Sequence, residues 1–352
     1  MILQADTAIE IREGEAPDTL KLEKYLQENI DLFDKIIAIK QYPGGFSNLT
    51  FLVITENKEY VLRRAPLGAN IKSAHDMGRE FKVLSLLHNN YSAIPKVFHF
   101  CESNEIIGAS FYLMEKVDGV ILRAKNAKKY NFPPEKWELL SQLLIDNLAQ
   151  LHQIDIFETG LVNLGKPEGY VDRQVDGWIE RYDKSKTDPI AEMEAIAIWL
   201  KNNKPTTQKF VFLHNDYKYD NVVFNADLTQ INAVLDWEMA TVGDPLMDLG
   251  ATLAYWCQAE SGDFMKTMNI TWFEGNLTRK EIVDRYSKIT NTDTSNILFY
   301  YIFGLFKNAT IMQQIFARWK AGLTKDPRFE QLIFGVKELA ILAKIAIENK
   351  TI

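Results

Sequence analysis

The feature of this sequence that most limits its fold is a change of periodicity after the first third of the chain. Before the change, short runs rich in β-branched and aromatic residues alternate with turn residues, at Lys35–Tyr42, Leu49–Thr55 and Glu59–Arg64. Such runs predict an antiparallel three-stranded meander. Two helices and two further strands are expected around it, at Thr19–Ile30, Ala74–His88, Lys96–Cys101 and Ser110–Glu115.

Beyond this part, apolar residues recur mostly at helical spacing. The predicted helices are Pro134–Gln153, Ile190–Asn202, Asp248–Tyr255, Lys280–Ile289, Asn296–Gly322 and Phe329–Glu348. One β-rich insertion, Val211–Asp236, interrupts them. We therefore predict an α+β bilobal fold, with an antiparallel-sheet N-lobe at residues 1–116 and a mostly helical C-lobe at residues 117–352. A ligand is expected between the lobes.

Composition narrows the possible functions. The formal charge of −7 disfavours general nucleic-acid binding, because an acidic protein repels phosphate backbones. The two cysteines, Cys101 and Cys257, lie far apart without a CxxC or CxxH pattern, which argues against a disulfide framework and a zinc site. The N-terminus has no apolar signal segment, and no apolar run approaches the roughly 18 residues of a membrane span. We therefore expect a soluble, cytoplasmic protein without a membrane partner.

The residues with the clearest chemical potential lie in the β-rich insertion. The triplet HND at 214–216 is followed by Asn221, which gives the pattern HxDxxxxN, and Asp236 follows a predicted hairpin. Phosphoryl transfer to a hydroxyl needs a carboxylate that orients the hydroxyl and accepts its proton, and oxygen ligands for Mg²⁺. Asp216 fits the first role, and Asn221 and Asp236 fit the second. Singly they would be ordinary turn and cap residues, but their joint order and spacing favour catalysis.

This arrangement resembles the aminoglycoside phosphotransferase and choline kinase-like family, small-molecule kinases with the protein-kinase fold. Within that family the sequence is similar to the branch joined in animals to acyl-CoA dehydrogenase domains. The resemblance runs from Gly44 to about Ala340, and its most specific segments are LAQLH at 148–152, the loop at 214–221 and the stretch at 235–249. It implies a bilobal kinase-like fold, ATP with Mg²⁺, and transfer to a small hydroxyl compound.

The resemblance also assigns nucleotide-binding roles in the N-terminal third. A loop between two predicted strands stands where the family covers the nucleotide phosphates, and it contains Gly44, Gly45, Ser47 and Asn48. Small residues there let backbone amides approach phosphate oxygens. Glu115 and Val117 fall in the connector between the lobes, where backbone groups can contact the adenine edge.

The strand Glu59–Arg64 is expected to supply a cation for the nucleotide phosphates. Kinases use a lysine paired with a helix glutamate, whereas this sequence has Arg63 and Arg64. Side chains alternate along a strand, so only one arginine can face the nucleotide, and we assign Arg63 with Glu80 as its partner. Arginine keeps the charge but changes the donor geometry. The alternative is that both arginines are solvated surface cations.

Several polar residues are expected to support the motif rather than to react. We expect His152 to bond nearby backbone and His214 to brace the loop. Asp244 stands at a helix entry, where capping explains it. By resemblance, Asp248 is the buried aspartate that hydrogen-bonds the catalytic-loop backbone. Lys218 is expected to reach the γ-phosphate, the alternative being a solvated lysine.

The phosphate acceptor is expected to contact the C-terminal helices. Residues 260–352 contain 13 Lys and Arg against 10 Asp and Glu. This mildly basic balance favours a neutral or anionic acceptor over a polycationic one. Lys307, Gln314 and Arg318 form a polar stripe on a predicted helix. A solvated face is its default interpretation, and an anion-binding wall is the alternative.

Two functional classes follow from these residues. The first is an ATP-dependent small-molecule kinase with Asp216 as base and Mg²⁺ held by Asn221 and Asp236. The second is a catalytically inactive regulator that binds a nucleotide or metabolite on the same fold, suggested only by the missing lysine. The intact base and metal-binding residues favour the enzyme.

Overall fold

The computed structural model describes residues 7–43, 48–66, 76–207, 209–324 and 326–352. They form two compact units. The first contains the chain up to Ile121 together with Asn221–Ala240, and the second contains Leu122–Asp220 and Thr241–Ile352. The first is built on an antiparallel sheet and the second is largely helical, so the predicted α+β class is confirmed.

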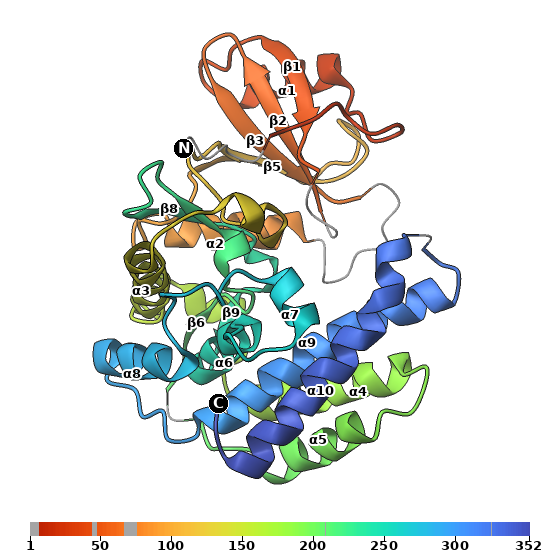
Figure 1. The fold of residues 1–352 in the computed structure, drawn as a ribbon. Coiled ribbons are helices and arrows are strands. Elements are labelled where there is room, and N and C mark those ends of the chain that lie inside the picture. The colour runs from red at the N-terminus through yellow and green to blue at the C-terminus, as the bar shows by residue number, and fades with distance from the viewer. Residues whose placement is uncertain (1–6, 44–47, 67–75, 208, 325) are drawn as a thin grey trace. The chain divides into compact units, whose positions relative to one another are not determined.

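The first unit contains a five-stranded antiparallel sheet in the order β1-β2-β3-β5-β4 (Figure 1). The strands are β1 (Ile36–Gln41), β2 (Leu49–Thr55), β3 (Glu59–Arg64), β4 (Val97–Cys101) and β5 (Phe111–Glu115). The predicted meander corresponds to β1, β2 and β3. Helices α1 (Thr19–Asn29) and α2 (Met77–Leu87) complete this part, and Asp18 and Asp76 cap their N-termini.

Alternation along β3 separates two environments. Tyr60 and Leu62 belong to a buried cluster that includes Leu22 and Leu26 of α1. Arg64 has the same parity, and its guanidinium lies 5.2 Å from the centre of the Phe51 ring in that cluster. Residues of the other parity, Arg63 among them, therefore lie on the opposite face of the strand.

The segment Asn221–Ala240, which overlaps the predicted β-rich insertion, contributes a two-stranded antiparallel sheet to the first unit. It consists of β7 (Val222–Phe224) and β8 (Ile231–Val234), as the predicted hairpin requires. A 3-10 turn, η4 (Trp237–Met239), follows and packs against α2. The predicted C-lobe, residues 117–352, includes this segment, and in the structure the segment belongs to the first compact unit.

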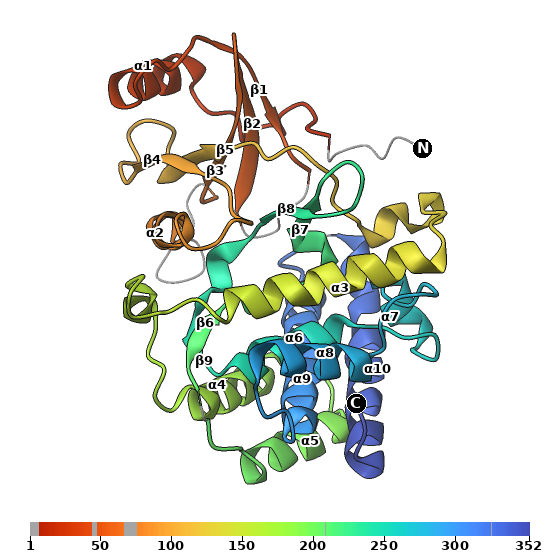
Figure 2. The ribbon, with the colours of Figure 1, turned by 90° about the vertical axis from the view of Figure 1, so that its left-hand side faces the viewer.

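The second unit consists mainly of helices: α3 (Pro134–Leu151), α4 (Tyr170–Ser185), α5 (Ala191–Asn202), α6 (Pro245–Tyr255), α7 (Asp263–Met268), α8 (Arg279–Thr290), α9 (Ile297–Lys320) and α10 (Leu332–Asn349). Helices α9 and α10 lie side by side, and α6 and α4 also pack on α9 (Figure 1). Helix α3, drawn at full length in Figure 2, packs against α8. A short ladder pairs β6 (Val211–Leu213) with β9 (Thr241–Gly243).

Helix α4 is absent from the sequence prediction, although its buried residues follow a helical pattern. Val171, Val175, Trp178 and Tyr182 recur at spacings of four, three and four and line its buried face. The many charged residues between them obscured this signal. Within the described part of the chain, no helix has the length and apolar character that a membrane crossing requires.

Candidate active site

In the second unit, the loop after β6 carries Asp216 and is held by a buried aspartate on α6. Asp248 is fully buried, and its two oxygens accept hydrogen bonds from the amides of His214 (2.6 Å) and Asn215 (2.8 Å). Asn215 has a φ of 67°, in the left-handed region that asparagine tolerates better than most residues. The predicted bracing role of Asp248 agrees with these contacts.

Two histidines extend this support. His152 contacts Asp248 Oδ2 through Nε2 (3.1 Å) and the Tyr286 hydroxyl through Nδ1 (2.7 Å). The expectation that its ring bonds nearby backbone was therefore wrong, because the ring contacts two side chains that are distant in sequence. His214 Nδ1 accepts the amide of Asp216 at 3.2 Å, so His214 does brace the loop. Burial alone would raise the pKa of Asp248, but hydrogen bonding to His152 and the charge of the neighbouring histidines lower it.

Asp216 is hydrogen-bonded by two side chains of the same unit. Lys218 Nζ donates to both carboxylate oxygens, at 2.8 and 2.9 Å, and the Tyr255 hydroxyl donates to Oδ1 at 2.8 Å. Lys218 also lies 4.6 Å from the centre of the Tyr255 ring. Burial acts to raise the pKa of Asp216, but Lys218 and Tyr255 outweigh it and hold the pKa below its usual value. Asp216 is therefore kept ionised, as a proton acceptor must be.

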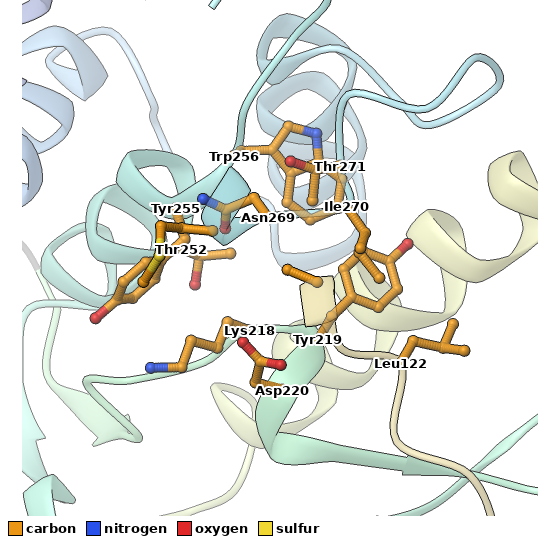
Figure 3. A pocket seen from close by; sticks show the side chains of 12 residues that line it. Leu122, Lys218, Tyr219, Asp220, Thr252, Tyr255, Trp256, Asn269, Ile270 and Thr271 are labelled. Carbon is orange, nitrogen blue, oxygen red and sulfur yellow. The ribbon is translucent and has the colours of Figure 1, made fainter. Parts of the chain in front are cut away.

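A pocket adjoins this carboxylate (Figure 3). Lys218 and Tyr255 line it, together with mainly aromatic, aliphatic and neutral polar side chains such as Trp256 and Ile270. Its cavity volume is only about 10 Å³, close to the space of one water molecule. Besides Lys218 and two tyrosines, the pocket is lined by one ionisable residue, Asp220. The Asp220 carboxylate lies 3.7 Å from the Arg123 guanidinium. Figure 3 shows the ends of Lys218 and Tyr255 on the same side of the pocket.

In the first unit, Arg63 connects two carboxylates. Its Nη1 lies 3.3 Å from Glu80 Oε1 on α2, and its Nη2 lies 3.2 Å from Asp236 Oδ1 after β8. The predicted pairing of Arg63 with Glu80 is therefore present. Burial alone would lower the pKa of Arg63, but Glu80 and then Asp236 raise it, so the guanidinium stays charged. Its side chain is 11% exposed, which excludes the alternative of a solvated surface cation.

Arg64 has a different environment. It donates to the backbone oxygens of Ile107 (2.9 Å) and Glu15 (2.6 Å) and is fully buried. The alternative of a surface cation is therefore wrong for Arg64 as well. Its contacts are those of a structural residue in the core of the first unit.

The hairpin places the two predicted metal ligands at one end. Asn221 immediately precedes β7, and its carbonyl accepts the amide of Leu235 at 2.8 Å, one residue before Asp236. Asp236 has a φ of 68°, and its side chain is 35% exposed. An amide and a carboxylate oxygen suit Mg²⁺, which takes its remaining ligands from phosphates and water. The residues present therefore fit the metal that the sequence predicts.

The remaining predicted nucleotide contacts are only partly described. Gly44, Gly45 and Ser47 lie outside the described residues. Asn48 is buried and donates from Nδ2 to Glu238 Oε2 at 2.9 Å. Glu115 ends β5, and its backbone amide donates to Lys96 O, while Val117 follows half-buried in the connector. Their contact with adenine stays a prediction.

Sequence reasoning missed Tyr255 and misjudged Lys307. Tyr255 ends an apolar helix, and nothing in its neighbourhood marks it as a partner of Asp216. The default of a solvated face was wrong for Lys307, which is only 4% exposed and donates to the carbonyl of Asn215 at 2.7 Å. Gln314 is half-buried and Arg318 is exposed, so the predicted stripe is not one continuous surface.

The curated relatives are much longer proteins. Acyl-CoA dehydrogenase family member 11 of Gallus gallus is 31% identical over 341 residues, which cover 94% of this chain and 44% of that protein. The Rattus norvegicus protein of the same name is 32% identical over 316 residues, covering 87% of this chain and 40% of its own length. The chain thus spans less than half the length of these relatives.

Solved structures share the fold. A Ralstonia eutropha protein assigned as an aminoglycoside phosphotransferase superposes with a TM-score of 0.79 at 27% identity, over 94% of this chain and 99% of that one. A spectinomycin phosphotransferase, crystallised with ADP and spectinomycin, has a TM-score of 0.58 at 13% identity, over 92% and 98%.

The sequence model of one family matches the centre of the chain, from residue 38 to residue 281. The match contains the Arg63 cluster, the Asp216 loop and the hairpin that ends at Asp236. With most of the chain covered and the kinase-like fold in place, this protein is a member of the phosphotransferase enzyme family.

Proposed function

We propose that the protein is a small-molecule kinase that transfers the γ-phosphate of ATP to a hydroxyl of a neutral or anionic metabolite. The observation that carries this proposal is the fixed carboxylate of Asp216. Its loop is held through Asp248, and Lys218 and Tyr255 keep it ionised. A carboxylate that is both ordered and charged can orient a hydroxyl and accept its proton.

The second support is the set of charges in the first unit. Arg63 is a buried cation with a fixed partner, Glu80, and can offer its guanidinium to nucleotide phosphates. Asn221 and Asp236 would hold Mg²⁺, which when bound neutralises the charge of the phosphates. Asp236 shares Arg63 with Glu80, so nucleotide binding is expected to rearrange the Arg63–Asp236 contact.

In the proposed reaction the acceptor hydroxyl gives its proton to Asp216. A bond forms between the acceptor oxygen and the γ-phosphorus, and the bond from that phosphorus to the β–γ bridging oxygen breaks to release ADP. Lys218, which lies against Asp216, can move its ammonium towards the transferred phosphoryl group and offset its charge.

The side chains of the pocket beside Asp216 support the proposed acceptor class. A polycationic aminoglycoside calls for several carboxylates, whereas this pocket contains Asp220 with Arg123 near it and otherwise neutral or basic side chains. Its aromatic and aliphatic walls favour an acceptor whose hydroxyl is attached to an apolar segment. By analogy with the dehydrogenase-linked relatives, hydroxyacyl-CoA compounds are included among the acceptors to be tested.

The competing function is a regulator that binds a nucleotide without transferring phosphate. It rests on arginine in place of the usual lysine, because a guanidinium has a different donor geometry from an ammonium. The two functions differ in one observable. Both bind ATP, but only the kinase releases ADP in proportion to an added acceptor.

The test combines binding and turnover. Thermal shift with ATP should show stabilisation that increases with Mg²⁺, and Asp236→Ala should lose the Mg²⁺-dependent part. Unchanged Mg²⁺ dependence in Asp236→Ala would remove Asp236 from the metal site. ADP release is then measured across hydroxylated metabolites, with a cationic aminoglycoside as the contrasting acceptor. Turnover of the aminoglycoside alone would contradict the proposed acceptor class.

A further inference from the structure

Lys307 lies in the middle of α9 and is almost completely buried within the second unit. Its Nζ donates to the backbone oxygen of Asn215 at 2.7 Å and lies 5.8 Å from the centre of the Trp178 ring on α4. Burial lowers its pKa to about 8, with the carboxylates of Asp216 and Asp248 opposing that effect. At neutral pH the side chain is therefore mostly an ammonium ion.

The carbonyl that Lys307 holds belongs to the peptide group that joins Asn215 to Asp216. A peptide group is planar, so fixing its oxygen and its N–H fixes the direction in which the next residue leaves the chain. Lys307 binds the oxygen, and His214 Nδ1 accepts the N–H of Asp216 at 3.2 Å. Both polar atoms of this peptide are therefore held by side chains.

Asn215 itself is held at three atoms from three helices. Its amide donates to Asp248 of α6, its oxygen accepts from Lys307 of α9, and its side-chain Oδ1 accepts from the Tyr170 hydroxyl of α4 at 3.2 Å. Its positive φ is uncommon for a residue other than glycine. Such a conformation persists when the surroundings determine it, as they do here.

Packing alone does not account for a lysine at this position. Methionine would fill a similar space without the cost of burying a charge. A long apolar side chain cannot, however, donate to the Asn215 carbonyl, which would lose this hydrogen bond. We therefore attribute the buried lysine to the hydrogen bond that its ammonium donates to the Asn215 carbonyl.

We propose that Lys307 is a positioning residue that orients the Asp216 carboxylate by holding the Asn215–Asp216 peptide. This inference rests on the proposed function of Asp216 as the base. Lys307 does not need to touch either substrate. Its loss should therefore lower the turnover rate and leave the affinities for ATP and acceptor nearly unchanged.

The first experiment compares three variants of the full chain. In Lys307→Met, kcat should fall by about 10–100-fold, since a small misplacement of a catalytic group has effects of that size. The Kd for ATP and the acceptor KM should stay within a few-fold. Lys307→Arg restores a charged donor and should recover part of the rate. Lys320→Met, at the exposed end of the same helix, is the matched control and should keep the parental kcat.

The second experiment does not depend on activity. Hydrogen exchange measured by mass spectrometry should show faster exchange in the segment containing residues 213–217 of Lys307→Met, with parental exchange in β1–β3. If the methionine variant does not fold, Lys307→Gln replaces it, because its shorter side chain also fails to reach Asn215.

The two experiments separate the inference from the proposed function. Parental kcat in Lys307→Met, or parental exchange in the loop, would overturn the positioning role. An unmodified protein that transfers no phosphate to any acceptor would overturn the proposed kinase function instead. In that case the exchange result still decides whether Lys307 orders the loop.

Discussion

The loop that carries Asp216 and the strand that carries Arg63 are held by different kinds of contact. In the helical unit, side chains bind the loop backbone: Asp248 holds two amides and Lys307 holds a carbonyl. In the strand-rich unit, the backbone of β3 is already fixed by its ladder, and Arg63 pairs with the side chains of Glu80 and Asp236.

This difference predicts which property of the protein changes when a residue of each region is substituted. A loop without a ladder depends on buried polar side chains, so its substitutions should affect turnover and stability. A strand keeps its backbone position when one side chain changes, so substitution of Arg63 should weaken nucleotide binding. It should also lower stability, because the buried Glu80 carboxylate loses its cation. The following substitutions test that contrast, in order of decreasing effect.

The largest effect is expected at Asp216. Asp216→Asn preserves shape but removes the proton-accepting charge, so kcat should fall by about 10²–10⁴-fold. ATP affinity, which the strand-rich unit is proposed to provide, should stay within a few-fold. Steady-state kinetics and calorimetric titration measure the two quantities. Asp183→Asn, a surface change in the same unit, is the control, and an equal kcat in the two variants would exclude the role of base.

Asp248→Ala should produce the largest loss of stability. It leaves two loop amides and His152 without their buried acceptor, and breaking such a charged network costs about 3–5 kcal/mol. Urea denaturation gives the free energy of unfolding. Thr278→Ala, at the exposed N-cap of α8 in the same unit, is the control, because losing a cap should cost only about 0.5–2 kcal/mol. Equal losses would mean that the loop is not held through Asp248.

The two arginines of β3 are expected to differ in their effect on ATP affinity. Arg63→Ala should weaken ATP binding by about 1.5–3 kcal/mol, the range of a charged hydrogen bond. Arg64→Ala should leave ATP affinity of the folded protein unchanged but lower stability, because two backbone oxygens in the first unit lose their donor. Binding and denaturation are measured for both variants. Weaker ATP binding in Arg64→Ala than in Arg63→Ala would show that Arg64, not Arg63, binds the nucleotide phosphates.

A smaller effect is expected at Tyr255. Its hydroxyl stabilises the ionised form of Asp216, so Tyr255→Phe should raise the pKa of Asp216 towards its ordinary value. The acid limb of the kcat profile should then move to higher pH, because Asp216 is lost as a base once it is protonated. Tyr219→Phe changes the same pocket but removes a bond to Asn276, and its acid limb should not move. If the acid limb lay at the same pH in the parental protein, Tyr255→Phe and Tyr219→Phe, Tyr255 would have no effect on the pKa of Asp216.

Sequence periodicity predicts those features that depend on residues within one strand or helix. Strand alternation distinguished Arg63 from Arg64, and apolar spacing located α9 and α10 within a few residues. The spacing of Asp216, Asn221 and Asp236 indicates phosphoryl-transfer chemistry from the sequence alone.

The missed features depend on residues distant in sequence. Lys307 looks like part of a solvated stripe because a helix pattern does not reveal which other elements cover that face. His152 bonds Asp248 and Tyr286, which lie 96 and 134 residues away. Tyr255 reaches Asp216 from the end of α6, where no spacing rule applies. Such contacts follow from tertiary packing and require the structure.

The most direct test of the account is the mass of the acceptor after incubation with MgATP. For an acceptor found in the ADP-release panel, the account predicts a gain of one phosphoryl group, equimolar ADP, and a strongly reduced yield with Asp216→Asn. ATP binding that depends on Mg²⁺, but with every acceptor recovered at its original mass, would contradict the kinase and favour the regulator.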